Sequence, residues 1–385
     1  MYLLKLIFRN AFRHKLRTAL TILGIVIAVL AFGLLQTVVD AWYTGVNASS
    51  ATRLITRNAI SLIFPLPITY EDKIRHVPGV STVSRSNWFG GIYIDKRNFF
   101  AQFATDAQPF FELYPEYHLA PDQMKAFVLD RKGCVVGRKL AQTYGWKLGD
   151  TIPLRGTIFP GNWEFVIRGI YEGAEAKTDE FQFIFHWDYL NESIKKTSPR
   201  RANQVGIYLV GINDADRAAE ISREIDAMFR NSLAETLTET EKAFALGFIS
   251  MVEAIVAAIR IVSFVIIVII MAVMANTMAM SARERTSEYA TLKALGFGPV
   301  YIETLIYGES LLIALSGGLL GIIATVPLVR GFGAVMVKLF PVFQFSPTTL
   351  AMQVGAVLVM GIVAAAVPAV RASRVRVAQG LRAIG

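Results

Sequence analysis

Residues 261–280 contain no ionisable side chain, and this apolar run constrains the fold more than any other feature of the sequence. An α-helix rises about 1.5 Å per residue, so about 20 apolar residues cross the roughly 30 Å hydrocarbon core of a bilayer. Three further runs reach a similar length, at residues 18–39, 310–329 and 350–370. The sequence therefore predicts a membrane protein with four transmembrane α-helices. A hydrophobic fraction of 54% agrees with that class.

The positive charge is concentrated beside these apolar runs. The chain has 39 Lys and Arg against 30 Asp and Glu, a formal net charge of +9, yet residues 40–250 are almost neutral. A basic face for nucleic acid is therefore not expected, and the excess is interpreted as a topology signal. It comes from Lys5, Arg9, Arg13, Lys15, Arg17, Arg283, Arg285, Lys293, Arg371, Arg374, Arg376 and Arg382, whereas the short loop near 330–349 has Arg330 and Lys338. The positive-inside rule then predicts cytoplasmic termini, a cytoplasmic 281–303 loop and a large domain outside.

The region between the first two runs is long enough for a folded domain. Residues 81–86, 99–105, 163–171, 181–187 and 205–211 have the composition of strands. Residues 138–144 form a predicted helix ended by Gly145, and Thr69 is a predicted helix cap. The predicted fold is therefore four transmembrane α-helices plus a mixed α/β periplasmic domain inserted between helices 1 and 2.

The predicted segments follow in order along the chain. They are an interfacial amphipathic helix (1–16), the first span (17–40), the outer domain (41–240), a stalk helix with the second span (241–280), the cytoplasmic loop (281–303), the third span (304–330), a short outer loop (331–348), the fourth span (349–371) and a cytoplasmic tail (372–385). The cations of the first helix would face anionic lipid headgroups. Apolar residues at helical spacing over 236–260 predict a stalk that enters the second span without a break, with a separate helix joined at Gly247 as the alternative.

Small and polar residues in the spans are candidates for helix packing. Gly24 with Ala28, and Gly317 with Gly321, have the four-residue spacing that lets helices approach closely in lipid. Glu309 lies at the start of the third apolar run, and it is interpreted as a structural or interfacial acid that pairs with an Arg or with backbone, with an ion-relay role as the alternative. Cys134 is the single cysteine, so it has no intrachain disulfide partner and is expected to be a packed core residue.

Signatures of catalysis are missing from the sequence. It has no G-x-x-x-x-G-K-[ST] phosphate loop, no H-E-x-x-H, no paired-cysteine metal spacing and no G-x-S-x-G. The four histidines are scattered. These patterns argue against an enzyme, a resident cofactor or a metal site in this chain.

Three segments resemble the MacB/FtsX-type permeases of ABC transporters, the type VII architecture. They are residues 9–25, which lead into the first span, residues 276–321, which include Arg-Glu-Arg-Thr-Ser-Glu and Lys-Ala-Leu-Gly, and residues 368–375 with 380–382. Fainter likeness to the MacB periplasmic core domain lies in residues 77–80 and 136–171. The wording of residues 288–294 is similar to that of separate-permease exporters of the DevC kind, which carry no fused ATPase.

The resemblance implies a mechanism and partners. It implies a bacterial inner-membrane permease dimer, from two copies or a copy and a paralogue, with two cytoplasmic ATPase subunits that hold ATP and Mg. It further implies a periplasmic adaptor, an outer-membrane channel and membrane lipid as partners. ATP-driven closure of the ATPases would press on a coupling helix and rearrange the outer domains without moving substrate between the spans. The implied coupling residues are Arg283, Glu284, Arg285, Glu288, Tyr289, Leu292, Lys293, Leu295 and Gly296.

Other functions stay open at this point. The leading hypothesis is a mechanotransmitting permease for export or for envelope lipid or lipoprotein handling. A non-transporting FtsX-like regulator would instead relay ATP hydrolysis to a periplasmic partner enzyme. A membrane receptor without any ATPase would leave the 283–296 segment without a role.

Overall fold

The chain divides into two compact units. The computed structural model describes residues 2–337, 340, 342–375 and 377. The helical unit comprises the described residues of Met1–Ala41, Glu253–Ala334 and Phe343–Gly385, and the α/β unit comprises those of Trp42–Val252 and Val335–Val342. Lys338, Arg376 and residues 380–382, which entered the topology and resemblance arguments, lie outside the described residues.

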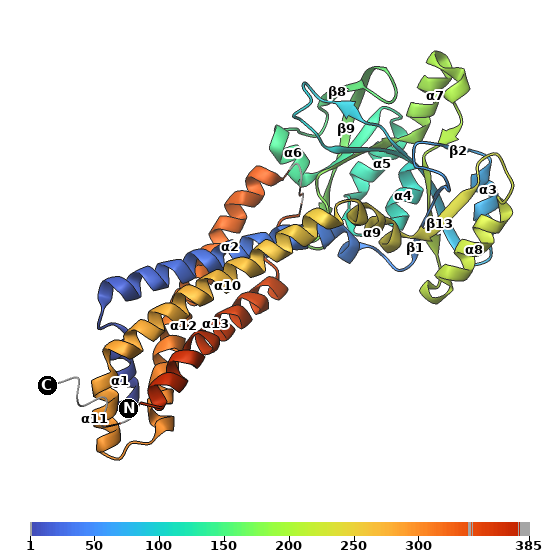
Figure 1. Ribbon diagram of the computed structural model, residues 1–385. Helices are drawn as coiled ribbons and strands as arrows, with labels where there is room; N and C mark the ends of the chain where they lie inside the picture. Colours follow the sequence, from blue (N-terminus) through green and yellow to red (C-terminus); the bar gives the residue numbers. More distant parts are fainter. Residues whose placement is uncertain (1, 338–339, 341, 376, 378–385) are drawn as a thin grey trace. The chain divides into compact units, whose positions relative to one another are not determined.

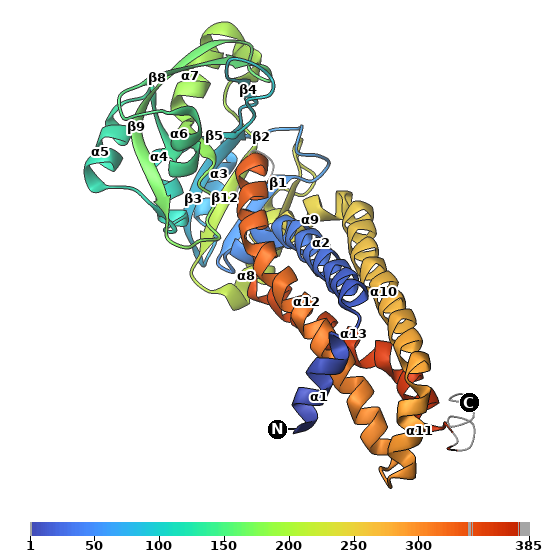
Figure 2. The ribbon, with the colours of Figure 1, turned by 90° about the vertical axis from the view of Figure 1, so that its left-hand side faces the viewer.

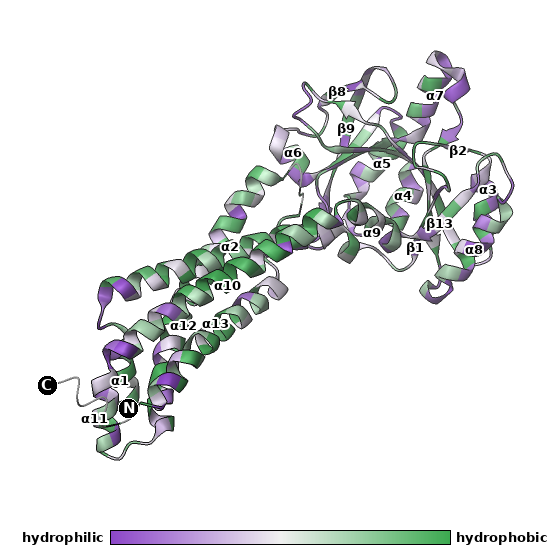
Figure 3. Ribbon diagram, in the orientation of Figure 1, coloured by the Kyte–Doolittle hydropathy of each residue, from purple (hydrophilic) through white to green (hydrophobic). Residues whose placement is uncertain are grey.

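The helical unit contains the four apolar runs as long helices. Its elements are α1 (Tyr2–Ala11), α2 (Lys15–Ala48, which continues into the α/β unit), α10 (Glu253–Glu284), α11 (Thr286–Ala294), α12 (Pro299–Met336) and α13 (Pro347–Ser373). Among the described residues, α2, α10, α12 and α13 are long and apolar enough to cross a membrane. Figures 1 and 2 show these four helices running alongside one another, and Figure 3 shows their apolar lengths in contrast to α11. The predicted four spans are confirmed as helices.

The α/β unit follows α2 in the chain and precedes α10. Its strands are β1 (Arg53–Asn58), β2 (Leu66–Pro67), β3 (Val80–Trp88), β4 (Gly91–Ile92), β5 (Ala101–Thr105), β6 (Tyr117–His118), β7 (Gly133–Gly137), β8 (Thr151–Gly156), β9 (Gly161–Gly173), β10 (Gln182–His186), β11 (Gln204–Val205), β12 (Ile207–Ile212) and β13 (Thr236–Thr240). Its helices are α3 (Tyr70–Arg75), α4 (Ala107–Leu113), α5 (Pro121–Leu129), α6 (Arg138–Tyr144), α7 (Trp187–Thr197), α8 (Ala218–Met228) and α9 (Glu241–Met251).

One large mixed sheet organises this unit. Its strand order is β13-β1-β12-β3-β5-β10-β7-β9-β8-β4, with β6 paired to β9. Successive side chains on a strand point to opposite faces of a sheet. In β7, accordingly, Cys134 and Val136 join one buried cluster and Val135 joins the other. The first cluster includes residues of α3, α6, α7 and α8, and the second includes residues of α4 and α5, so helices cover both faces of the sheet.

Several sequence predictions for this unit are confirmed. The helix at residues 138–144 has the predicted bounds, and Gly145 ends it with a left-handed φ of +70°. The predicted strands at 81–86, 99–105, 163–171, 181–187 and 205–211 correspond to β3, β5, β9, β10 and β12. Cys134 is fully buried, as expected of a packed core residue, and burial raises the pKa of its thiol well above the ordinary value.

Three predictions in this region are wrong. Thr69 occupies the residue before α3, but its side chain makes no capping hydrogen bond. Residues 236–240 form β13 rather than part of a helix, because they pair with β1. The stalk is not continuous, since α9 ends at Met251 and α10 begins at Glu253. Val252 adopts φ −113° and ψ 10° between them, so the break lies five residues beyond the Gly247 alternative.

Candidate functional site

The predicted coupling helix forms as α11, a short helix between two long ones. Gly296 follows it with a φ of +93°, a backbone conformation that favours glycine. The amide of Gly296 donates to the Lys293 carbonyl at 3.0 Å, and the amide of Phe297 donates to the Leu292 carbonyl at 3.1 Å. This pair of bonds is the Schellman arrangement, which satisfies the last carbonyls of a helix. The end of α11 is therefore sharply defined, as the Gly296 signal predicts.

The inner side of α11 is fixed by a buried arginine. Arg285 is 7% exposed, and its Nη1 donates to Glu309 Oε1 of α12 at 2.5 Å. Its Nε donates to Glu288 Oε2 at 2.9 Å, so one guanidinium joins two carboxylates. The Tyr289 ring, 1% exposed, lies beneath the guanidinium with its centroid 5.2 Å from Cζ. The sequence analysis offers either an arginine or backbone as the partner of Glu309. The structure gives it an arginine, Arg285.

Electrostatics favour the charged forms of Arg285 and Glu288. Burial by itself would lower the pKa of Arg285, but Glu309, Tyr289 and Glu288 together outweigh burial and hold that pKa above its ordinary value. Partial burial would raise the pKa of Glu288, whereas hydrogen bonds from Arg13 and Arg285 hold it below its ordinary value. Arg285 therefore stays a guanidinium and Glu288 stays a carboxylate, and each lies against a group of opposite charge.

The N-terminal segment adds three contacts that the sequence analysis does not predict. Arg13 Nη1 donates to Glu288, and Arg17 donates through two nitrogens to Glu284 at 2.8 and 3.0 Å. His14 Nε2 lies 3.4 Å from Glu284 Oε2. These partners are more than 260 positions apart in sequence, so no local pattern could have paired them. Both acids belong to the predicted coupling set, and both face the N-terminal segment.

Lys293 fixes the other end of α11. Its Nζ donates to the carbonyls of Ser373 and Val375, the latter at 2.8 Å, at the C-terminal end of α13. A cation there also complements the negative end of the helix dipole. The basic segments near α1, α11 and the end of α13 thus meet at one end of the helical unit. The predicted cytoplasmic placement of that end stays a prediction.

The turn after α11 and the start of α12 expose apolar side chains. Leu295 is 71% exposed, Phe297 41% and Val300 73%. Arg283 is exposed, while Leu292 is half-buried. Phe297 and Val300 are not among the predicted coupling residues, although both lie within four positions of Gly296 in the predicted cytoplasmic loop. We name Leu295, Phe297 and Val300 the apolar tip.

The predicted helix-packing residues lie in close contacts within the chain. A Cβ on Gly317 would lie 2.8 Å from Ile25 Cβ, and one on Gly321 would lie 2.9 Å from Val29 Cβ. These two glycines therefore let α12 approach α2. A Cβ on Gly24 would lie 2.8 Å from Ile270 Cδ1 of α10, and Ala28 is 4% exposed. Each of these contacts joins helices of one chain.

A second buried arginine lies in the α/β unit, where the chain enters and leaves it. Arg53, 6% exposed, donates to Glu241 Oε2 at 2.8 Å and to both carboxylate oxygens of Glu116 at 2.8 and 3.1 Å. Glu241 also accepts from the Ser50 amide at 2.8 Å and from the Tyr114 hydroxyl at 3.0 Å. The residue that begins α9 is thus bonded to the segment that follows α2. We name Arg53, Glu116 and Glu241 the entry clasp.

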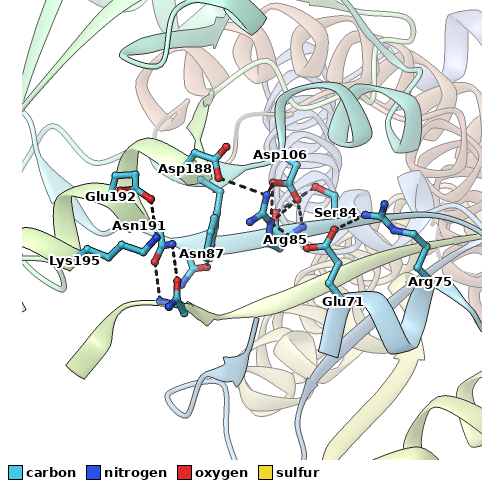
Figure 4. Close-up of polar contacts among 12 residues, drawn as sticks. Glu71, Arg75, Ser84, Arg85, Asn87, Asp106, Asp188, Asn191, Glu192 and Lys195 are labelled. Atoms are coloured by element: carbon cyan, nitrogen blue, oxygen red, sulfur yellow. Dashed lines mark hydrogen bonds and ion pairs between the residues drawn. The ribbon is translucent and has the colours of Figure 1, made fainter. Parts of the chain in front are cut away.

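A third arginine cluster joins four elements of the α/β unit (Figure 4). Arg85 of β3 donates to Asp106, which precedes α4, with Nε to Oδ1 at 2.9 Å, and it lies 3.3 Å from Glu71 of α3. Its guanidinium also lies over the Trp187 ring, with Cζ 4.1 Å from the centroid. All of these acids are tied to the arginine, so the cluster is a brace between elements. Among the described residues, no group of His, Cys, Asp and Glu could hold a metal ion.

Comparison with known families agrees with this architecture. Residues 18–228 match the family model of the MacB-like periplasmic core domain, and residues 260–377 match that of the FtsX-like permease C-terminal. The chain belongs to the MacB/FtsX-type ABC transporter permeases. Membership implies a membrane subunit that works with an ATPase partner.

The similar proteins share little sequence identity with this chain. An uncharacterized ABC transporter permease of Methanocaldococcus jannaschii is 24% identical over an alignment 343 positions long, which covers 82% of this chain and 80% of that one. The periplasmic region of MacB from Actinobacillus actinomycetemcomitans matches at 10% identity and a TM-score of 0.38, over 53% of this chain and 95% of that one. The extracellular domain of the transporter YknZ from Gram-positive bacteria matches at 12% identity and a TM-score of 0.34, over 49% and 98%.

Proposed function

We propose that this MacB/FtsX-type permease converts ATP binding by a partner ATPase on the cytoplasmic side into rearrangement of its α/β domain on the other side. The observation that carries the proposal is that α11 is fixed to the rest of the helical unit and is followed directly by exposed apolar residues. Its inner side is fixed to α12, to the N-terminal segment and to α13 by Arg285, Glu288 and Lys293. The apolar tip at its end is free to meet a partner.

Force applied to the apolar tip has direct routes into the spans. Because Arg285 bonds Glu309, a shift of α11 pulls on α12, and because Glu284 bonds Arg17, it pulls on the start of α2. Helix α2 leads into the segment before β1, and α9 leads through Val252 into α10. The entry clasp bonds Glu241, the first residue of α9, to Ser50 and Arg53. Rearrangement of α2 and α10 would therefore reach β1 and α9 together.

The same proposal covers the assembly. Two such permeases, either two copies or a copy and a paralogue, would sit in a bacterial inner membrane with their termini in the cytoplasm. ATP and Mg would be held by the ATPase subunits, and the α/β domain would meet a periplasmic adaptor joined to an outer-membrane channel. The work would be export or envelope lipid or lipoprotein handling. We favour a separate permease of the DevC-like or MacB-like kind.

Co-purification with a co-expressed ATPase subunit of the family tests the proposal. Leu295→Asp places a charge in the apolar tip, so we expect at least a tenfold loss of bound ATPase at unchanged membrane insertion. Leu233→Asp alters a fully exposed leucine in the α/β unit and is the matched control. Equal ATPase recovery with both variants would contradict docking at the tip.

A further inference from the structure

An open groove lies between α4 and α5 on the surface of the α/β unit. It encloses about 570 Å³, and its floor is apolar, formed mainly by Phe111, Met124, Val128 and Leu129. Val128 is 43% exposed and Leu129 75%, although both follow directly on the fully buried Phe127. One side of α5 therefore packs on the core, and a second side exposes apolar residues to solvent. An ordinary amphipathic surface helix has polar residues on its exposed side.

The walls of the groove carry opposite charges. Glu112 lies on the α4 wall and Lys125 on the α5 wall, and both are exposed. In the described part of the chain neither joins an ion pair, and Glu112 accepts only a neutral hydrogen bond, from Gln108 Nε2 at 3.0 Å. An apolar floor between an unneutralised acid and an unneutralised base presents a pattern of three stripes.

This pattern fits an amphipathic helix. A small molecule would be poorly enclosed, because small-molecule sites bury most of the ligand surface and this groove is shallow and open. An added strand would need a free sheet edge, whereas both walls are helices. A lipid headgroup would favour a cluster of cations, and the rim supplies one cation opposite one anion. Helix-in-groove docking uses an apolar stripe for affinity and flanking charges for alignment.

We propose that the α4–α5 groove docks an amphipathic helix of an extracytoplasmic partner protein, with a cation of that helix facing Glu112 and an anion facing Lys125. The inference rests on the proposed function for the outer location of the α/β domain, and it names the chemistry of the partner met there. The contact area of a single groove is small, so the helix alone binds weakly, with a Kd on the order of 100 µM. Met124 can adjust its side chain to the partner.

The test measures fluorescence anisotropy of three synthetic helical peptides with the full-length protein in lipid nanodiscs. The peptides share one leucine stripe and differ in its two flanks, which are one basic and one acidic, both acidic, or both basic. Wild type should prefer the mixed peptide. Glu112→Lys makes both walls basic and should prefer the acidic peptide, whereas Lys125→Glu should prefer the basic peptide. We expect each preference to be at least threefold.

Two further variants distinguish binding in the groove from nonspecific hydrophobic binding elsewhere on the protein. Val128→Asp should abolish binding of all three peptides, and Leu148→Asp, at a site 51% exposed outside the groove, should not. A peptide ranking that ignores the charge reversals, retained binding by Val128→Asp, or signals equal to those of empty nanodiscs would each overturn the inference. ATPase co-purification is measured on the same samples. If no ATPase co-purifies but the order of peptide affinities is as expected, the proposed function is contradicted and the groove inference is not.

Discussion

Removing one partner of the buried Arg285–Glu309 pair is the sharpest test of how α11 is held. The variant Arg285→Met keeps the length and apolar stem of the side chain but removes the guanidinium. Glu309, which is 3% exposed, then has no cation at the position where Nη1 lies 2.5 Å from its Oε1. Glu288 keeps its bond from Arg13, so the loss falls mainly on Glu309.

The expected magnitude follows from burial of the charge. Breaking a buried ion pair by removing one partner costs about 3–5 kcal/mol, because the remaining charge stays desolvated. Replacing both partners by apolar residues is often neutral. Arg285→Met/Glu309→Leu should therefore recover most of the stability that Arg285→Met loses, and a double-mutant cycle should give a coupling energy of about 2–3 kcal/mol.

The molecule offers separate readouts for its two units. All five tryptophans lie within Trp42–Val252, so tryptophan fluorescence reports on the α/β unit. Helical circular dichroism of the full-length protein in detergent also reports on the helical unit. Arg285→Met should lower the thermal midpoint seen by circular dichroism and leave the fluorescence transition in place.

Two results would refute the reasoning. A wild-type circular dichroism midpoint for Arg285→Met would mean that Glu309 is not held as a buried, paired charge. A folded double variant with full stimulation of the partner ATPase would mean that the pair stabilises α11 but transmits no movement to α12. We expect the double variant to fold, bind the ATPase and lose its coupling to it.

Three more outcomes are expected. Gly321→Ala should destabilise the helical unit by about 1–3 kcal/mol through overpacking against α2, whereas Gly355→Ala, whose Cβ would meet nothing within 4 Å, should not; circular dichroism melting compares them. Arg53→Met should destabilise the α/β unit by about 3–5 kcal/mol and so lower the thermal midpoint of tryptophan fluorescence, because Glu116 and Glu241, whose side chain is 15% exposed, both lose their cation. An unchanged midpoint would contradict the entry clasp. Burial holds the pKa of His186 below its ordinary 6.5, so the unfolded chain binds more protons there and stability falls as the pH drops below about 6.5. In His186→Gln the thermal midpoint of fluorescence should therefore change less between pH 7 and 5 than in wild type. An equal change in both proteins would mean that other groups cause the pH dependence.

Local patterns in the sequence were sufficient for the elements. The four spans follow from uninterrupted apolar length, since a helix satisfies its backbone hydrogen bonds within the segment and needs no water in the lipid. The helix at residues 138–144 and the end of α11 follow from Gly145 and Gly296, whose left-handed φ angles few other residues adopt. Such signals act over a few residues, so they survive without knowledge of the rest of the chain.

The wrong strand and helix predictions come from places where long-range pairing overrides local sequence patterns. Leu237 lies seven residues before Phe244, a spacing that suits a helix, but pairing with β1 makes residues 236–240 a strand. β1 is not among the predicted strands, and in the sheet it pairs with β12 on one side and β13 on the other. The break at Val252 has no Gly or Pro to announce it. Propensity is a weak preference that tertiary pairing can override.

The sequence by itself determined that this chain has four helices long and apolar enough to span a membrane, that its basic residues flank them, and that a short helix follows the second one. Only the tertiary structure decided how that helix is held and which residues after it stay exposed. Arg13 and Arg17 look like topology charges in sequence, yet they bond Glu288 and Glu284 across more than 260 positions. Charge pairing depends on distance in space, and distance in space is set by how the long helices pack, which no local pattern encodes.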